Sequence, residues 1–386
     1  MTWVTDQIEE TTKVEKHLHI VCFDVPYPLD YGGVFDPFCI IKTLHELGIH
    51  IHLHCFEYGR GRQQELEKYC VDVNYYARNE GHKGFSTKIP YIVSSRSSNE
   101  LLENLQRDQY PVFLEAVHCT YPLYAGALKN RKVILRLHNV EYLYYRHLFY
   151  HERSWLKKAY FFNESRLLKQ YERKLANQAT ILALSEKDID LYKLKFHAPD
   201  ISYLPIFIPF QQVAGKEGLG TYCLYHGNLS VAENEKAAGW LLEHVFDKVK
   251  FPFVIAGKNP SSRLQRLAEL NAQACLIPNP DDQEMKDLIA KAQINILPSF
   301  NDTGIKLKLL NALYNGRHCI VNEAAIHQTG LEPACYIGTN AKAFQHIIVQ
   351  LYNHPFGEEE ISLRKKLLGT QFSNRKNAQQ LIELIW

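Results

Sequence analysis

The sequence predicts an α/β protein built from two Rossmann-like domains, each a doubly wound parallel sheet. Short apolar runs alternate with segments of helical periodicity along the chain, which is the pattern of βαβ units whose sheets are covered on both faces. The alternation pauses at 205–220, the densest Pro and Gly stretch between strong strand patterns, and then starts again. The 386 residues are also about 2.6 times the ~150 expected for one domain.

The predicted strands form two series, separated by this Pro and Gly stretch. They are expected at 17–23, 49–56, 112–116, 132–137 and 180–184, and then at 221–226, 253–256, 274–277, 294–298 and 318–321. Helical patterns fill the intervals between them. We therefore expect an N-terminal domain at 1–204, a linker at 205–220 and a second domain at 221–371. The remaining residues, 372–386, are expected to form a terminal helix that docks on the N-terminal domain.

Composition and charge narrow the class of function. Apolar residues make up 46% of the chain and charged residues 22%, which is globular composition. Lys and Arg total 44 against 42 Asp and Glu, so the net charge of +2 gives no global attraction to nucleic acid. The polar N-terminus and the absence of a long uncharged apolar run disfavour secretion and membrane spanning. Nine dispersed cysteines favour a reducing compartment, so we expect a cytoplasmic protein.

The strongest local motif is a predicted strand, polar loop and helix at 294–316. Lys306 and Lys308 fall in the first turn of this helix, just after Gly304. Unpaired N–H groups and the helix dipole already favour negative charge there, so each cation costs about 0.3–1 kcal/mol when no anion is bound. A bound phosphate would reverse that sign. The alternative is that both lysines point into water and the glycine forms an ordinary turn.

Around this motif the chain resembles the glycosyltransferases of GT-B fold, close to family 4 (group 1). The residues that carry the resemblance are 222–229, Asn234, 254–257 and 298–316 and, less specifically, 31–33, 44–48, 137–141 and 184–186. The resemblance implies two domains facing across a cleft, with 1–204 on the acceptor side and 221–371 binding the nucleotide sugar. It also implies a nucleotide-diphosphate sugar as donor substrate, retention of anomeric configuration, and that no metal ion is required.

The resemblance assigns several residues to the sugar donor. They are Gly304, Ile305, Lys306, Lys308, Asn228 and Asn311, with Gly32 and Gly33 approaching the diphosphate from the other domain. For the glycine pair the alternative is a loop turn of positive φ.

Three asparagines depart from the family pattern. Asn311 stands where such enzymes usually carry a glutamate that binds the ribose of the sugar donor, while Asn228 and Asn234 replace a frequent arginine and lysine. An amide oxygen still accepts a hydrogen bond, but without the charge that strengthens it. Two hypotheses follow: an unusually specific enzyme, or a non-catalytic module that binds a sugar nucleotide or a partner.

His138 and Glu141 are the candidate catalytic residues. His138 follows the predicted strand 132–137, so it should emerge at the carboxyl edge of the sheet. The resemblance implies that it stands near the transferred sugar, with Glu141 one turn further on. The alternative is a histidine that only caps a helix.

A second histidine pattern, His50, His52 and His54, alternates along one predicted strand. Neighbouring members lie ~7 Å apart and the outer two ~13 Å, too far for one zinc ion with bonds of ~2.0 Å. A structural role is favoured, with a zinc hydrolase as the rival reading.

The stretch 138–174 interleaves ten aromatic residues with eight Lys or Arg and four Glu. This pattern suits peripheral contact of 142–174 with the inner face of the membrane, or a grip on a lipid-linked acceptor. It suits core aromatics beneath a solvated basic face equally well.

Together these features predict transfer of a sugar from a nucleotide-diphosphate sugar to the hydroxyl group of a saccharide or lipid-linked acceptor. A helix terminus with two lysines can stabilise the leaving diphosphate without a metal ion. The family suggests a place in the synthesis of a surface polysaccharide or glycolipid.

Overall fold

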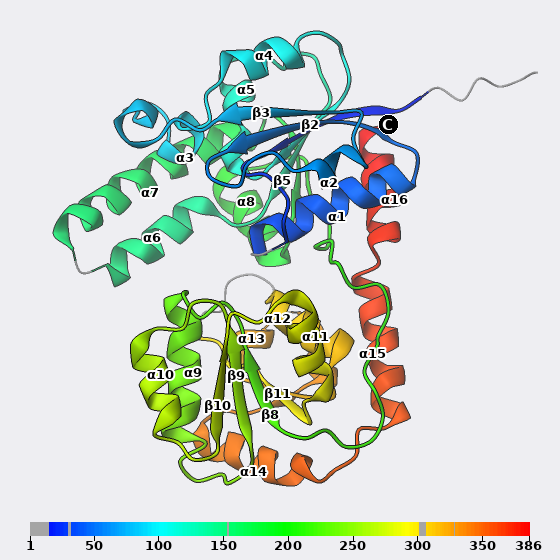
Figure 1. Cartoon of the computed structure of the whole chain (residues 1–386). Helices are drawn as coiled ribbons and strands as arrows, with labels where there is room; N and C mark the ends of the chain where they lie inside the picture. The colour runs from blue at the N-terminus through cyan, green and yellow to red at the C-terminus, as the bar shows by residue number, and fades with distance from the viewer. Residues whose placement is uncertain (1–14, 30–31, 153, 301–305, 328) are drawn as a thin grey trace, which may run out of the picture. The chain divides into compact units, whose positions relative to one another are not determined.

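The computed structural model describes residues 15–29, 32–152, 154–300, 306–327 and 329–386 (Figure 1). The chain divides into two compact units, each with one parallel sheet. Unit 1 comprises Met1–Leu204 with Ala378–Trp386, and unit 2 comprises Pro205–Asn377. The two Rossmann-like sheets, of seven and six strands, confirm the predicted fold class.

The sheet of unit 1 has the order β3-β2-β1-β4-β5-β6-β7, and every pair is parallel. Its strands are β1 (His17–Cys22), β2 (His50–Glu57), β3 (Asp72–Ala77), β4 (Val112–Glu115), β5 (Val133–Leu137), β6 (Thr180–Ala183) and β7 (Ile201–Tyr203). The sequence analysis missed the two edge strands. The first is mostly exposed or half-buried and lacks an apolar run, and the second has only three residues.

Helices connect these strands, as parallel pairing requires. They are α1 (Gly32–Glu46), α2 (Gln64–Glu67), α3 (Tyr91–Ser94), α4 (Asn99–Leu105), α5 (Tyr121–Tyr124), α6 (Glu141–His151), α7 (Trp155–Leu175) and α8 (Glu186–Phe196), with short 3-10 turns at Gly81–Gly84 and Val117–Cys119. The final helix, α16 (Asn374–Ile385), contacts the same unit. Its Gln380 side chain donates to the Tyr203 carbonyl, and the Lys16 ammonium lies 5.0 Å from the Trp386 ring centroid.

The sheet of unit 2 has the order β10-β9-β8-β11-β12-β13, again parallel throughout. Its strands are β8 (Cys223–His226), β9 (Phe253–Gly257), β10 (Ala274–Pro278), β11 (Ile294–Ile296), β12 (His318–Val321) and β13 (Tyr336–Ile337). The helices are α9 (Ala232–His244), α10 (Ser262–Glu269), α11 (Asp282–Lys291), α12 (Leu307–Asn315), α13 (Glu323–Ile326), α14 (Ala341–Tyr352) and α15 (Glu358–Gln371), with a 3-10 turn at Glu332–Ala334. Helices α9 and α10 lie on one side of the sheet, and α11 and α12 on the other (Figure 1).

A buried arginine anchors the C-terminal end of α12. The Arg364 guanidinium, 2% exposed, donates to the carbonyl groups of Leu313, Gly316 and Arg317. A side chain at Gly316 would place its Cβ 2.3 Å from the Asn295 amide nitrogen, so only glycine fits where the helix stops. The helix predicted to carry the anion site is therefore fixed at its far end.

Within the part of the chain that the structure describes, no helix is both long enough and apolar enough to cross a membrane.

Candidate functional site

Helix α12 starts at Leu307, so Lys308 lies in its first turn as predicted, whereas Lys306 is the extended residue before the helix and not part of that turn. Gly304 and Ile305 lie outside the described residues. The Lys308 side chain turns toward the sheet, where its ammonium donates to the Tyr225 hydroxyl at 3.1 Å and to Asn234 Oδ1 at 2.9 Å. The alternative that both lysines point into water is therefore wrong for Lys308.

The environment of Lys308 is polar, but its hydrogen-bond partners among the described residues carry no negative charge. Its ammonium lies 4.9 Å from the centroid of the Tyr225 ring, and both atoms that accept its hydrogen bonds are neutral. Burial and, to a smaller extent, the neighbouring Lys306 charge together lower the pKa of Lys308 to about 8. An ammonium has three N–H donors, so one remains to bind an anion here.

Two glycines, at the ends of β8 and β9, let neighbouring segments approach closely beside this lysine. Gly227 has a φ of +159°, and a Cβ there would lie 3.5 Å from the Asn234 side chain and 3.7 Å from the Lys308 side chain. A Cβ at Gly257 would lie only 1.8 Å from the Gly227 carbonyl oxygen. The backbone at Gly227 therefore passes close to the aliphatic part of the Lys308 side chain.

The two asparagines near β8 are occupied by local hydrogen bonds. Asn228 Oδ1 accepts from the Ser230 backbone N–H at 3.1 Å and the Ser230 hydroxyl at 2.7 Å, which forms an Asx turn before α9. The Asn234 amide nitrogen donates to the Asn228 carbonyl at 2.9 Å, while its oxygen holds Lys308. Where the family carries a lysine, this chain therefore has Asn234, whose side-chain oxygen accepts a hydrogen bond from Lys308.

Asn311 lies within α12, on the same helix as Lys308. Its Oδ1 accepts from the Asn315 amide at 2.8 Å. One lone pair of this oxygen is thus used inside the helix, which leaves a single acceptor position where the family's glutamate would offer several.

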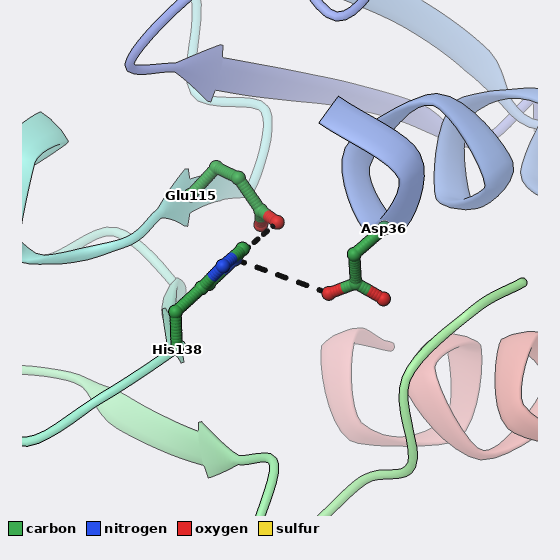
Figure 2. A group of neighbouring side chains, drawn as sticks. All are labelled: Asp36, Glu115 and His138. Carbon is green, nitrogen blue, oxygen red and sulfur yellow. Dashed lines mark hydrogen bonds and ion pairs between the residues drawn. The ribbon is translucent and has the colours of Figure 1, made fainter. Parts of the chain in front are cut away.

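In unit 1, His138 follows β5 and lies at the carboxyl edge of the sheet, as expected. Its Nε2 is 2.7 Å from Oε1 of Glu115, the last residue of β4, and 3.9 Å from Oδ2 of Asp36 on α1 (Figure 2). Arg136 on β5 donates to the Asp36 carboxylate at 2.9 and 3.3 Å, and to the Leu204 carbonyl at 2.7 Å. Cations and carboxylates alternate through this group.

The charges of this group are coupled. Burial lowers the pKa of His138, but the charge of Glu115 and its hydrogen bond outweigh burial, so the pKa lies above its ordinary value. Burial also raises the pKa of Glu115, whose second carboxylate oxygen, Oε2, is buried without a hydrogen-bond partner. The pair can therefore share one proton.

Glu141 is separate from the His138 pair. It is the first residue of α6, is 5% exposed, and burial raises its pKa to about 7. Its backbone N–H donates to Glu172, a second buried carboxyl group, whose pKa burial raises to about 8. The structure shows no hydrogen bond between Glu141 and His138, so only charge links them.

Asp36, Glu115 and His138 could also hold a metal ion, because their ligand atoms lie within 4.8 Å of one another. A divalent cation there would compete with the Arg136 guanidinium for Asp36 and with the His138 proton for Glu115. The two carboxylates and the imidazole are ligand types that suit a metal ion, but the negative charge of Asp36 is already neutralised by the Arg136 guanidinium.

Gly32 and Gly33 form the first turn of α1, so the alternative of a positive-φ turn is wrong. Their position at a helix N-terminus that follows β1 still suits an anion.

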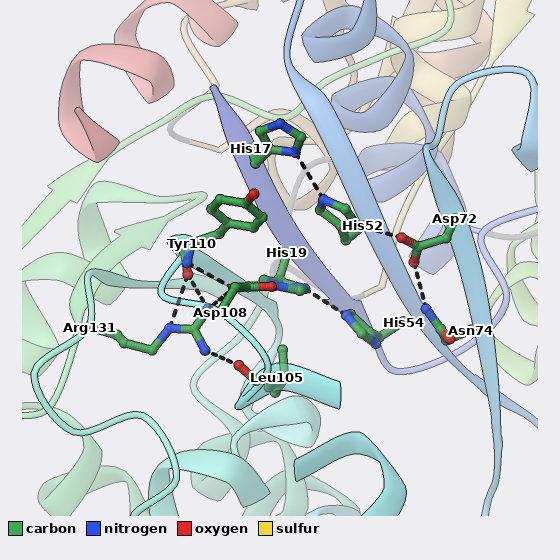
Figure 3. A network of polar contacts seen from close by, with 10 residues as sticks. All are labelled: His17, His19, His52, His54, Asp72, Asn74, Leu105, Asp108, Tyr110 and Arg131. Atoms are coloured by element: carbon green, nitrogen blue, oxygen red, sulfur yellow. Dashed lines mark hydrogen bonds and ion pairs between the residues drawn. The ribbon is translucent and has the colours of Figure 1, made fainter. Parts of the chain in front are cut away.

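The alternating histidines belong to a ladder across β1 and β2 (Figure 3). His52 bonds His17 at 3.0 Å and Asp72 at 2.5 Å, and His54 bonds His19 and the Tyr76 hydroxyl, both at 2.8 Å. Both ring nitrogens of His52 and His54 are therefore occupied. Burial lowers the pKa of His54 to about 3, so its ring is neutral. The ladder fits the structural role and leaves these two rings no ligand atom for zinc.

The model for glycosyl transferases group 1 matches residues 220–354, which form most of unit 2. The chain carries a group 1 glycosyltransferase domain. Lys308, Asn234 and Asn311 lie inside this glycosyltransferase domain, whereas His138 and Glu141 lie outside the match.

Relatives extend the likeness over both units. An uncharacterised 44.6 kDa protein in the cps region of Klebsiella pneumoniae is 29% identical over 332 residues, covering 81% of this chain and 84% of that protein. Sucrose-phosphate synthase from Thermosynechococcus elongatus superposes with a TM-score of 0.69 at 11% identity, covering 96% of this chain and 98% of that one. HepE from Anabaena, solved with UDP and glucose, gives 0.62 at 10% identity with the same coverage. The whole chain, with its two sheets, therefore has a GT-B-like fold.

Sequence reasoning missed Asp36, Glu115 and Arg136 as neighbours of His138. A signal was present for two of them, because Glu115 ends the apolar run of β4 and Arg136 interrupts that of β5. A charged residue inside a buried strand needs a partner of opposite charge. Here Arg136 is paired with Asp36 and Glu115 with His138, and His138 also lies 3.9 Å from Asp36.

Proposed function

We propose that this chain transfers a sugar from a nucleotide-diphosphate sugar to a hydroxyl acceptor. The observation that carries the proposal is Lys308, a partly buried cation with neutral hydrogen-bond partners in the first turn of α12. The leaving diphosphate gains charge as its bond to the sugar breaks, and a fixed ammonium beside a helix N-terminus stabilises that charge. The complex of HepE with UDP supports a nucleotide as the leaving group.

On the sugar-donor side, Lys308 and Lys306 bind the diphosphate, and Gly304 and Ile305, outside the described residues, belong to the same proposed donor-binding set. Asn311 accepts one hydrogen bond from the ribose. Asn228 orders the turn that precedes α9. This set stabilises the leaving group without a metal ion.

On the acceptor side, His138 and Glu141 act on protons. Paired with Glu115, the charged His138 ring can donate from its other nitrogen to a sugar hydroxyl or a developing charge. Glu141, with a pKa of about 7, can exchange a proton near neutral pH. Retention of anomeric configuration remains the family's expectation for this transfer.

The synthesis of a surface polysaccharide or glycolipid is the proposed setting, because the Klebsiella relative is encoded in the cps region. A cytoplasmic enzyme held at the inner face of the membrane would meet both a soluble nucleotide sugar and a lipid-linked acceptor.

A thermal-shift screen against UDP-, GDP- and other nucleotide sugars tests the proposal. One sugar nucleotide should raise the melting temperature of the native protein and of Lys365→Met, an exposed control, but not that of Lys308→Met. A screen in which no nucleotide sugar raises the melting temperature would contradict it.

The second candidate is a non-catalytic module, which the three asparagines at Asn228, Asn234 and Asn311 favour. A turnover assay that follows release of the nucleotide diphosphate separates the two. Binding of a nucleotide sugar without transfer to any saccharide or lipid-linked acceptor would support the module.

A further inference from the structure

Helices α6 and α7 form a hairpin (Figure 1). Side chains of both helices line a pocket of about 180 Å³. Three cations line it, Arg146 from α6 with Arg166 and Lys169 from α7. Aromatic rings complete the wall, with Tyr142 at one end and Phe149 and Phe162, whose centroids are 5.6 Å apart, at the other. The lining is thus divided between positive charge and apolar surface.

Among the described residues, no carboxylate forms an ion pair with these three cations. Arg146 and Lys169 instead lie 6.0 and 5.9 Å from the Tyr142 ring centroid. The acidic residues of the two helices face other partners. Glu164 accepts from the Tyr91 backbone, and Glu172 accepts from the backbone at the start of α6. Three cations around one pocket repel one another, so the pocket favours an anion.

The same end of the hairpin exposes large apolar side chains. Trp155 is 75% exposed, Leu156 62% and Tyr150 67%. Tyr150 lines the pocket itself, and the Lys158 ammonium, one turn after Trp155, lies 5.4 Å from the ring of Phe149, which also lines it. A Trp beside basic residues suits a membrane interface, where one end of the ring is apolar and the other is wet.

The size of the pocket selects among anions. Pockets that enclose a drug-sized ligand are about 300–1,000 Å³, so this one is too small for a nucleotide sugar. A single phosphate group with a few attached carbons fits the volume. Its apolar wall suits hydrocarbon next to that phosphate.

We propose that the α6–α7 pocket binds the phosphate group of an anionic membrane lipid, with Trp155 and Leu156 lying in the membrane surface. Arg146, Arg166 and Lys169 hold the phosphate, and Phe149 and Phe162 contact the first carbons of the lipid. This inference deepens the acceptor side of the proposed function, yet the binding itself requires no transfer reaction.

Vesicle co-sedimentation of the full chain tests the inference. The protein should bind vesicles of phosphatidylcholine with phosphatidylglycerol and not vesicles of phosphatidylcholine alone. The variant R146Q/R166Q/K169Q should lose at least about tenfold in affinity, since each basic residue near an anionic surface contributes about fivefold. The matched control K187Q/K193Q/K195Q removes three exposed charges from α8 and should bind nearly as well as the native protein.

A second arm separates lipid from soluble phosphate. Trp155→Ala should weaken vesicle binding, and millimolar glycerol phosphate should not displace the native protein from vesicles. Three outcomes overturn the inference: no binding to anionic vesicles, equal loss in the α8 control, or displacement by glycerol phosphate. The thermal shift with a nucleotide sugar should persist in R146Q/R166Q/K169Q, so failure here leaves the proposed function standing.

Discussion

Lys308 in unit 2 and His138 in unit 1 are both withdrawn from solvent, but their charges are compensated in opposite ways. Lys308 has neutral acceptors in Tyr225 and Asn234. His138 faces two carboxylates, with Arg136 completing a group of nearly balanced charge. The first arrangement favours an incoming anion. The second is already satisfied and is suited to holding a proton in place.

The largest effect is expected from a substitution that removes one charge from the group of Asp36, Glu115, Arg136 and His138. Arg136→Met removes a fully buried guanidinium and leaves Asp36, 1% exposed, without that partner. Breaking a buried pair on one side costs about 3–5 kcal/mol, so the melting temperature of unit 1 should fall sharply. Calorimetry or chemical denaturation would measure this loss.

A second variant sharpens this result. Asp36→Leu with Arg136→Met replaces both charges with apolar groups and should recover much of the stability. As a control, Lys68→Met removes one member of the exposed pair with Glu65 and should change nothing measurable. An Arg136→Met variant as stable as Lys68→Met would refute the contrast drawn between the two sites.

The next largest effect is expected at Lys308, whose charge has no anionic hydrogen-bond partner among the described residues. Lys308→Met keeps the length of the side chain and removes its charge, so the apo protein should lose little stability. Affinity for the sugar nucleotide should fall at least about tenfold, since a hydrogen bond to a charged group contributes about 1.5–3 kcal/mol. Titration calorimetry would report it. Unchanged affinity would remove Lys308 from the anion site.

How much of this contrast could be predicted from the sequence depends on how far apart in the chain the contacting residues lie. The alternation of apolar runs and helical periods predicted ten of the thirteen strands, because each is set by its own residues. β3, β7 and β13 were missed since they are exposed or only two to six residues long. The position of Lys308 in the first turn was also local. Its orientation was not, because its acceptors lie 83 and 74 residues away in the chain.

The pH dependence should separate binding from folding at Lys308. Its pKa in the folded protein is about 8, below the ~10.4 of an unfolded chain, so the unfolded state holds more protons between these values. Apo stability should therefore rise as the pH increases from 8 to 10. Affinity for the sugar nucleotide should fall up to about tenfold per pH unit over the same range, because the neutral amine no longer attracts the diphosphate. Thermal melts with and without ligand would show both trends.

In Lys308→Met both of these trends should flatten. If the affinity of this variant still fell between pH 8 and 10, the titrating group would lie elsewhere.

The smallest effect tests whether Asn311 limits ribose binding. Asn311→Glu restores the family's carboxylate, which can accept from Asn315 and from a ribose hydroxyl at once. The gain from a neutral to a charged acceptor is about 1 kcal/mol, so affinity should rise about fivefold. Asn311→Gln, which lengthens the side chain without adding charge, is the control. Titration of both variants with the sugar nucleotide measures the two affinities. Equal affinities would mean that other groups bind the ribose and that the asparagine at 311 does not weaken binding of the sugar nucleotide.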